Sequence, residues 1–93
     1  MKMIRWNEEK NQLLLIQRGL SFEMVLEKIE KKEIIAKKEH HNKTKYPNQF
    51  VFIIELNGYI CYIPFVENDE EIFLKSIIPS RKLHKEYKGD KNG

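Results

Sequence analysis

Residues 49–66 read QFVFIIELNGYICYIPFV, two apolar runs joined by Asn57-Gly58. A type I′ turn needs positive φ at both central positions, which Asn and Gly adopt readily, so this dipeptide predicts an antiparallel hairpin with a two-residue turn. The turn fixes the register and so divides the side chains between two faces. One, the core face, is wholly apolar and carries Phe50, Phe52, Ile54, Leu56, Tyr59, Cys61, Ile63 and Phe65. The other, the second face, carries Val51, Ile53, Glu55, Ile60, Tyr62 and Pro64.

Two helices are predicted upstream of the hairpin. Asn7, followed by two glutamates, has the form of an N-cap, and Arg18-Gly19 has the form of a helix end. Ser21 then begins a second helix, which should end around Lys32 and has one apolar stripe made of Phe22, Val25, Leu26 and Ile29. We expect this helix pair to pack on the core face.

The remaining segments predict a small sheet around the hairpin. Residues 34–36 suggest a short strand that enters a polar loop over 37–48, and residues 72–78 suggest a third strand that ends at Pro79. In that strand Leu74 should join the core face while Lys75 points to the second face. Residues 80–87 fit a short helix or an extended segment, and residues 89–93 should be frayed. The predicted fold class is α+β, a single domain over residues 1–93 with two N-terminal helices on one face of a three- to four-stranded antiparallel sheet.

Length and composition exclude several classes of protein. A chain of 93 residues with 41% apolar residues can bury one core, and one cysteine, Cys61, cannot form a disulfide within the chain. The longest apolar run, residues 59–66, is far too short for a membrane span, and the first ten residues lack the apolar segment of a signal peptide. We therefore expect a cytoplasmic protein.

The net charge of +3 is unevenly distributed along the chain. Residues 31–46 and 75–93 each carry a local charge of +4, whereas residues 67–71 carry −4. Surface lysines are commonly no more than a means of solubility, and the second basic block could be a solvated tail. The functional interpretation is a cationic surface beside the second face of the sheet, formed by Lys75, Arg81, Lys82, His84, Lys85 and Tyr87 together with Tyr62 and Glu55.

Such a surface suits single-stranded RNA and also its cleavage. The ribose 2′-hydroxyl can attack its own phosphodiester when a base takes its proton, cations stabilise the added charge, and an acid protonates the leaving oxygen. Arg81 is the preferred group for that charge because a guanidinium binds two phosphate oxygens and stays protonated. His40 and His41 are adjacent loop residues without an evident third ligand, so a metal site is not expected, and no sequence motif for a bound cofactor occurs.

Two segments carry a resemblance to a known family. Trp6-Asn7-Glu8-Glu9-Lys10-Asn11 and Arg18-Gly19-Leu20-Ser21-Phe22-Glu23 resemble, in residues and spacing, the N-terminal signature of the BrnT family of type II toxins, W-D-x-x-K-N and H/R-G-V/I-S-F-E. The Asn57-Gly58 hairpin, the strand 73–77, and Pro79-Ser80-Arg81-Lys82 followed by Tyr87 look like the later part of the same family.

The resemblance implies a RelE-like fold and a metal-independent endoribonuclease that inhibits translation. It implies a cognate antitoxin, usually a ribbon-helix-helix DNA-binding protein, through which alone the toxin would reach operator DNA. Carried over by position, it makes Arg81, Lys75 and Lys82 the catalytic candidates. Further candidates for acid-base chemistry are Glu55, His40, His41 and Tyr87, and for RNA binding Tyr62, His84 and Lys85. A non-catalytic module that binds nucleic acid or protein, and a degenerate toxin kept as a regulatory partner, remain the alternatives.

Overall fold

The β3–β4 hairpin has the register that Asn57-Gly58 predicts. Strand β3 (Gln49–Leu56) pairs antiparallel with β4 (Tyr59–Glu67), with Leu56 opposite Tyr59 at the turn and Phe50 opposite Phe65 at the open end. Both turn residues have positive φ, 53° for Asn57 and 80° for Gly58. The prediction of two faces is therefore confirmed for this hairpin.

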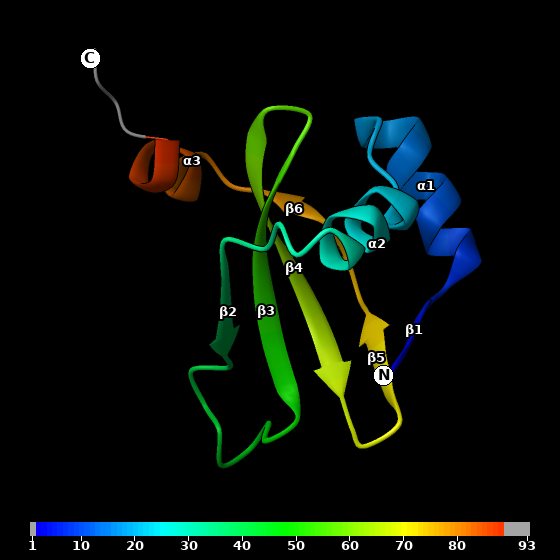
Figure 1. Ribbon diagram of the computed structural model, residues 1–93, viewed down its shortest axis with the longest axis vertical. Coiled ribbons are helices and arrows are strands. Elements are labelled where there is room, and N and C mark those ends of the chain that lie inside the picture. Colours follow the sequence, from blue (N-terminus) through cyan, green and yellow to red (C-terminus); the bar gives the residue numbers. More distant parts are fainter. Residues whose placement is uncertain (1, 89–93) are drawn as a thin grey trace.

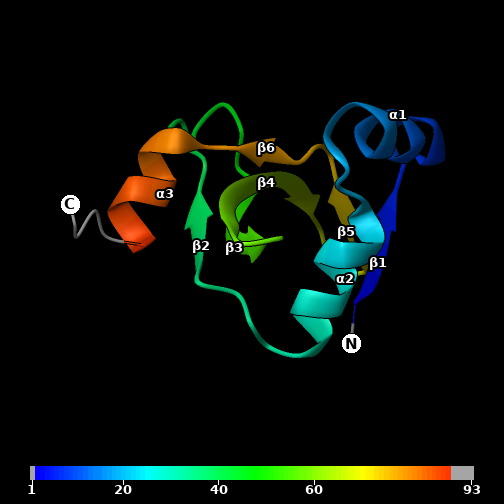
Figure 2. The same ribbon diagram turned by 90° about the horizontal axis from the view of Figure 1, so that it is seen from above.

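A computed structural model describes residues 2–88, which form an α+β fold with three helices and a six-stranded mixed sheet (Figure 1). The other elements, in chain order, are β1 (Met3–Trp6), α1 (Glu8–Arg18), α2 (Phe22–Glu30), β2 (Ala36–Glu39), β5 (Glu71–Leu74), β6 (Ile78–Pro79) and α3 (Arg81–Lys88). The strand order is β1-β5-β4-β3-β2, and β6 pairs with β4. Figures 1 and 2 show α3 well apart from α1 and α2, with the β3–β4 hairpin between them.

The main core lies between α1, α2 and the core face of the sheet. Phe22 and Val25 of α2 are fully buried, and they pack in one cluster with Leu14 of α1 and with the inward residues of the hairpin, of which Ile54 and Ile63 have no exposed surface. Burying side chains of this size stabilises the fold by about 1.5–3 kcal/mol each. The prediction that the two N-terminal helices cover the core face is confirmed.

The corner between α1 and α2 is held by Asn11, whose side chain is 2% exposed. The backbone N–H of Phe22 donates to Asn11 Oδ1 at 2.7 Å, and Asn11 Nδ2 donates to Glu23 at 2.9 Å. Ser21 occupies the N-cap position of α2 but its side chain makes no capping hydrogen bond. Asn11 therefore supplies, from the preceding helix, the acceptor that we expected from Ser21.

The prediction of a purely antiparallel sheet with three or four strands is wrong. Strand β1 pairs parallel with β5, placing Ile4 opposite Ile72 and Trp6 opposite Leu74. The alternation in β1 directs Ile4 and Trp6 to the core face, where the Trp6 and Phe22 rings stack with centroids 5.7 Å apart. The two strands of this parallel pair are almost seventy positions apart, so no turn motif in the sequence predicts their pairing.

The third predicted strand, residues 72–78, is broken by a bulge. Between Leu74, opposite Phe65, and Ile78, opposite Tyr62, the chain has three residues where β4 has two. The additional residue reverses the alternation, so that Ile77 is fully buried in the main core together with Leu74. The strand ends at Pro79 as predicted, since Pro79 is the last residue of β6, and Arg18 of α1 donates to the carbonyl oxygen of Ile77 beside the bulge.

Two further segments differ from, or complete, the predictions. Strand β2 begins at Ala36, not at residue 34, and continues to Glu39 into the stretch predicted as loop; its residues pair with 50–53 of β3. Of the two forms left open for residues 80–87, the structure has the helix, α3. The predicted frayed segment 89–93 lies outside the described residues.

Candidate functional site

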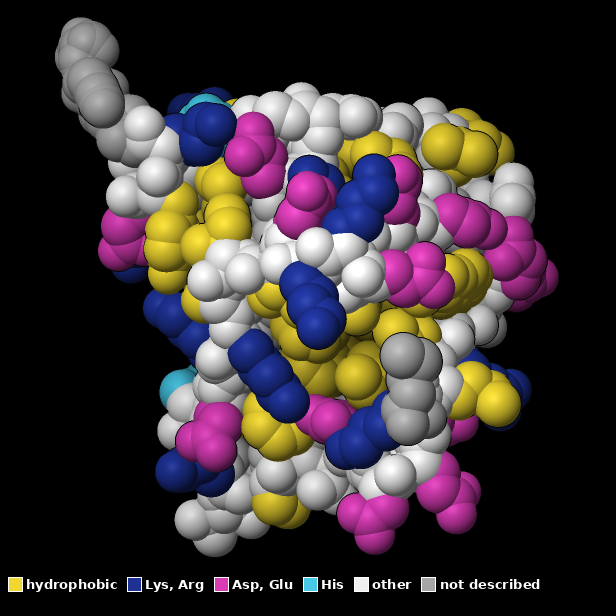
Figure 3. Space-filling view, in the orientation of Figure 1, with side chains coloured by type: hydrophobic (Ala, Val, Ile, Leu, Met, Phe, Trp, Pro, Cys, Tyr) yellow, Lys and Arg dark blue, Asp and Glu magenta, His cyan; other side chains and the backbone are white. Residues whose placement is uncertain are grey.

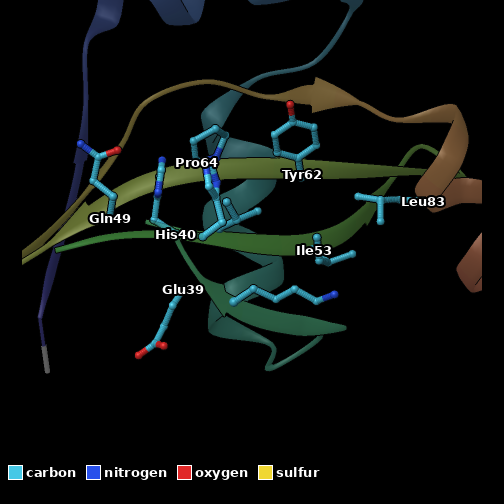
Figure 4. Close-up of a pocket in the computed structure, with 10 residues that line it drawn as sticks. Glu39, His40, Gln49, Ile53, Tyr62, Pro64 and Leu83 are labelled. Carbon is cyan, nitrogen blue, oxygen red and sulfur yellow. The ribbon is translucent and has the colours of Figure 1, made fainter. Parts of the chain in front are cut away.

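A groove on the second face of the sheet contains several of the predicted site residues. It has a volume of about 540 Å³, and its floor is apolar, formed by Val51 and Ile53 of β3 and by Tyr62 and Pro64 of β4. Leu83 of α3 lines it as well (Figure 4). The polar lining comes from β2, the segment after it and the start of β3: Lys38, Glu39, His40, His41 and Gln49. In Figure 4 the carboxylate of Glu39 points away from the other labelled side chains.

His40 and His41 stack on one another at this groove, with ring centroids 4.4 Å apart and planes 25° from parallel. The Tyr46 ring also contacts His40, with the two ring centroids 4.6 Å apart. The backbone N–H of Asn42 donates to His40 Nδ1 at 3.0 Å, so neutral His40 carries its proton on Nε2. His41 is the more exposed of the two rings. One imidazole is therefore fixed as a donor, while its neighbour keeps a nitrogen available to accept a proton.

Lys38 belongs to the groove, and the sequence reasoning missed it. It pairs with Val51, which places it on the second face, and its side chain is exposed. The sequence prediction treated residues 37–48 as a loop. In a strand, successive side chains point to opposite faces of the sheet, and this alternation is what places Lys38, but not Lys37, on the second face. Gln49 and Pro64 lie in the predicted hairpin but were not among the predicted site residues, and Leu83 was missed because only the packing of α3 brings it to the groove.

The cations of α3 lie beside the groove but do not line it. Ser80 begins the helix, and its Oγ accepts a hydrogen bond from the backbone N–H of Leu83 at 3.1 Å. The side chains of Arg81, Lys82 and Lys85 are exposed. Tyr87, near the end of the helix, is 39% exposed.

Two of the predicted site residues attach α3 to the sheet. The backbone N–H of Ile60 donates to His84 Nδ1 at 3.3 Å, and the His84 ring stacks on Tyr59 with centroids 4.2 Å apart and planes 10° from parallel. Glu55 forms an ion pair with Lys88 at 3.1 Å. In this arrangement Ile53 and Ile60 of the second face are buried, apart from the main core. His84 and Glu55 thus have structural partners where the sequence suggested contact with RNA or proton transfer.

Lys75 is separate from both groups. It directly follows β5, its side chain is exposed, and its backbone N–H donates to the carbonyl oxygen of Pro64 at 2.8 Å. The ammonium group lies 5.9 Å from the centroid of the Phe73 ring. Like the α3 cations, Lys75 is not among the residues that line the groove.

Cys61 lies on the core face, where burial raises the pKa of its thiol to about 11 although the charge of Arg18 acts in the opposite direction. The thiol is therefore protonated at neutral pH, as a buried structural cysteine should be. Within residues 2–88, no group of three or more His, Cys, Asp or Glu side chains is arranged to hold a metal ion. None of the helices in that range is long and apolar enough to span a bilayer.

Comparison with protein-family models, curated protein sequences and solved structures gives no match. The residues of the BrnT-like signature can nevertheless be placed. Trp6 Nε1 donates to Glu8, Asn7 Oδ1 caps α1, Asn11 caps α2, and Gly19 ends α1 with a φ of 68°. All of them belong to the helical corner over the core face, so the signature describes how this chain folds and contributes no side chain to the groove.

Proposed function

We propose that this protein is the toxin of a type II toxin-antitoxin system, with a RelE-like fold and a place in the BrnT family. In this proposal it acts in the cytoplasm as a metal-independent endoribonuclease and inhibits translation by cutting RNA. The observation that carries the proposal is the His40-His41 pair, which lies with Lys38 beside an apolar floor that Leu83 of α3 also lines. The signature residues of the helical corner support the family assignment.

The groove suits a nucleotide in two respects. The apolar floor, with the Tyr62 ring and Pro64, offers a surface on which a base can stack, and the lysine and histidine side chains at its edge offer donors for a phosphate. Arg81, Lys82 and Lys85 on α3, and Lys75 beyond β5, would hold the flanking phosphates. In this proposal the four cations position the RNA and neutralise the charge of its phosphates.

The proposed reaction uses groups within the groove. His41 takes the proton of the ribose 2′-hydroxyl, the 2′-oxygen forms a bond to phosphorus, and the bond from phosphorus to the 5′-oxygen breaks. His40, through its Nε2–H, and Lys38 donate to the non-bridging oxygens as their charge grows. The Tyr62 hydroxyl protonates the leaving 5′-oxygen. The products are a 2′,3′-cyclic phosphate and a 5′-hydroxyl.

The test is cleavage of single-stranded RNA by the purified protein in buffer that contains EDTA. We expect 2′,3′-cyclic phosphate ends, and His41→Gln should lower the cleavage rate by about 100-fold or more, the usual contribution of a proton-transfer group. The affinity for the same oligonucleotide with 2′-deoxyribose at the cut site should stay unchanged. Lys31→Gln, an exposed lysine outside the groove, is the matched control. RNA left whole by the wild-type protein refutes the ribonuclease proposal.

A non-catalytic binding module is the second candidate, and the α3 attachments favour it. His84 and Glu55 are engaged with Ile60 and Lys88, which leaves exposed cations as the main feature of that helix. His41→Gln separates the two candidates. A ribonuclease would lose most of its cleavage rate with little change in RNA affinity, whereas a docking surface would retain its affinity and have no cleavage to lose.

The partner in the proposal is a cognate antitoxin, a ribbon-helix-helix DNA-binding protein encoded beside this chain, through which the pair would bind operator DNA. Co-expression should protect cells from the toxin, and the two proteins should co-purify. Co-purification of an inactive toxin would instead favour the degenerate toxin that serves as a regulatory partner.

A further inference from the structure

Helix α2 and the sheet enclose an apolar groove on the core-face side of the molecule. Phe22 and Val25 in the first half of α2 are fully buried, but Leu26 and Ile29 further along are only partly buried. Together with Ile4 of β1 and Ile72 of β5, these two residues line a groove of about 410 Å³. Figure 3 shows hydrophobic side chains exposed below α2, with Lys or Arg side chains around them.

Helix α1 presents a second apolar surface, on the side that turns away from the sheet. Leu14 and Asn11 face the core, whereas Leu13 is 51% exposed and Ile16 is 79% exposed. These two residues are three positions apart and therefore neighbours on one face of the helix, next to Glu9 and Gln12. Apolar side chains grouped in this way on a small protein commonly mark a contact with another molecule.

Each surface also carries a charged group that can pair with the other. Lys2, Lys32 and Glu30 lie at the rim of the groove; Lys2 is already paired with Glu67, so Lys32 is the rim cation that can meet an acidic group of another molecule. The α1 surface carries the opposite sign through Glu9. Within residues 2–88, Lys32 and Glu9 form no ion pair that this contact would have to break.

We propose that the occupant of the α2–sheet groove is helix α1 of a second copy of this chain. Leu13 and Ile16 of one copy pack against Leu26 and Ile29 of the other, and Glu9 lies near Lys32 of the rim. Because α1 and the groove are different patches, a twofold axis closes a dimer when each copy gives its helix and receives the other. The inference does not depend on the proposed ribonuclease activity, since the groove on the second face is not involved.

Sedimentation velocity over a micromolar-to-millimolar range of protein concentration tests the proposal. A contact of this limited size should be transient, and the wild-type protein should move from monomer to dimer as concentration rises. Ile16→Glu should raise the dissociation constant by about tenfold or more, because it places a charge where an apolar side chain is buried. Ile35→Glu is the matched control: Ile35 is 42% exposed and belongs to neither surface.

Charge reversal tests which surface receives the helix. Glu9→Lys and Lys32→Glu should each weaken self-association, and the mixture of the two variants should restore it, because opposite charges then face each other in both contacts of the mixed dimer. Circular dichroism establishes that each variant is folded.

Three results would overturn the proposal. They are a wild-type protein that stays monomeric, equal effects of Ile16→Glu and Ile35→Glu, and self-association that Lys32→Glu leaves unchanged. If the protein is monomeric while an acidic amphipathic peptide binds and Lys32→Glu abolishes that binding, the groove serves a different chain and not a second copy.

Discussion

Replacing Asn11 should destabilise the protein by removing the hydrogen bonds that hold the helical corner. In Asn11→Leu the side chain keeps about the same size, but its polar atoms are lost at a position that is 2% exposed. The N–H of Phe22, which donates to Asn11 Oδ1 at 2.7 Å, then remains buried without an acceptor. An unsatisfied buried donor costs about 1–3 kcal/mol, and loss of the bond to the Glu23 carboxylate, 2.9 Å long, adds about 1 kcal/mol.

The expected loss in the free energy of unfolding is therefore about 2–4 kcal/mol, out of about 5–15 kcal/mol for a typical domain. In a domain of this size, 1 kcal/mol shifts Tm by about 4–8 °C, so Tm should fall by about 8–32 °C. Urea denaturation followed by circular dichroism and by the fluorescence of Trp6 measures the change, and a two-state transition allows the free energies to be compared.

Ser21→Ala is the control for this experiment, since Ser21 holds the N-cap position of α2 but makes no capping hydrogen bond with its side chain. It should cost less than about 1 kcal/mol, below the usual cost of removing a functioning cap. If Ser21→Ala destabilises the fold as much as Asn11→Leu does, or if Asn11→Leu is nearly neutral, Asn11 does not hold the corner.

Three further predictions concern the backbone, an ion-pair cluster and the thiol. Lys32→Gly should stabilise the fold by up to about 1 kcal/mol in urea denaturation, because Lys32 has a φ of 58°, where a side chain is strained; a loss of stability would contradict this. Burial raises the pKa of Glu67, but the hydrogen bonds and charges of Lys2 and Lys37 outweigh it and hold the pKa below the ordinary 4.5. The stability that the Glu67 ion pairs contribute is therefore present above pH 4.5 and is lost as pH falls through the lowered pKa. On acidification below pH 4.5, Glu67→Gln should lose less stability than the wild type does, and equal losses would refute the assignment. The Cys61 thiol, with a pKa of about 11, should react with thiol reagents at pH 8 only as fast as the protein unfolds, and rapid labelling would show that it is accessible.

The parts of the fold that the sequence predicts are those set by neighbouring residues. Asn57-Gly58 determines the hairpin register, and Asn7 and Gly19 mark the two ends of α1 by capping and by a left-handed φ. Strand β1 was missed although Ile4 and Trp6 alternate correctly, because its partner β5 lies almost seventy residues away and is parallel. The bulge before Ile77 was missed because the adjacent apolar residues Ile77 and Ile78 fit either alternation.

The sequence predicts several of the residues that form the candidate site, but not how they are arranged in space. The basic segments and the second face are evident in the sequence, and His40, His41 and Tyr62 do meet at one groove. The sequence does not reveal that α3 attaches through His84 and Glu55, since these contacts depend on how the helix packs on β4. Lys38 became visible only with the pairing of β2 to β3.

The family-like signature and the groove lie on opposite faces of the sheet, and this separation affects how each should respond to mutation. Asn11, Trp6 and Gly19 set the helical corner on the core face, so changes there act on stability and should affect the proposed RNA cleavage only by reducing the amount of folded protein. His41 and Lys38 are exposed on the second face and carry little of the packing, so changes there should alter cleavage without lowering Tm. A chain can therefore keep the signature and the fold while its chemistry changes, and the ribonuclease proposal stands or falls on the groove residues, whatever the corner shares with BrnT toxins.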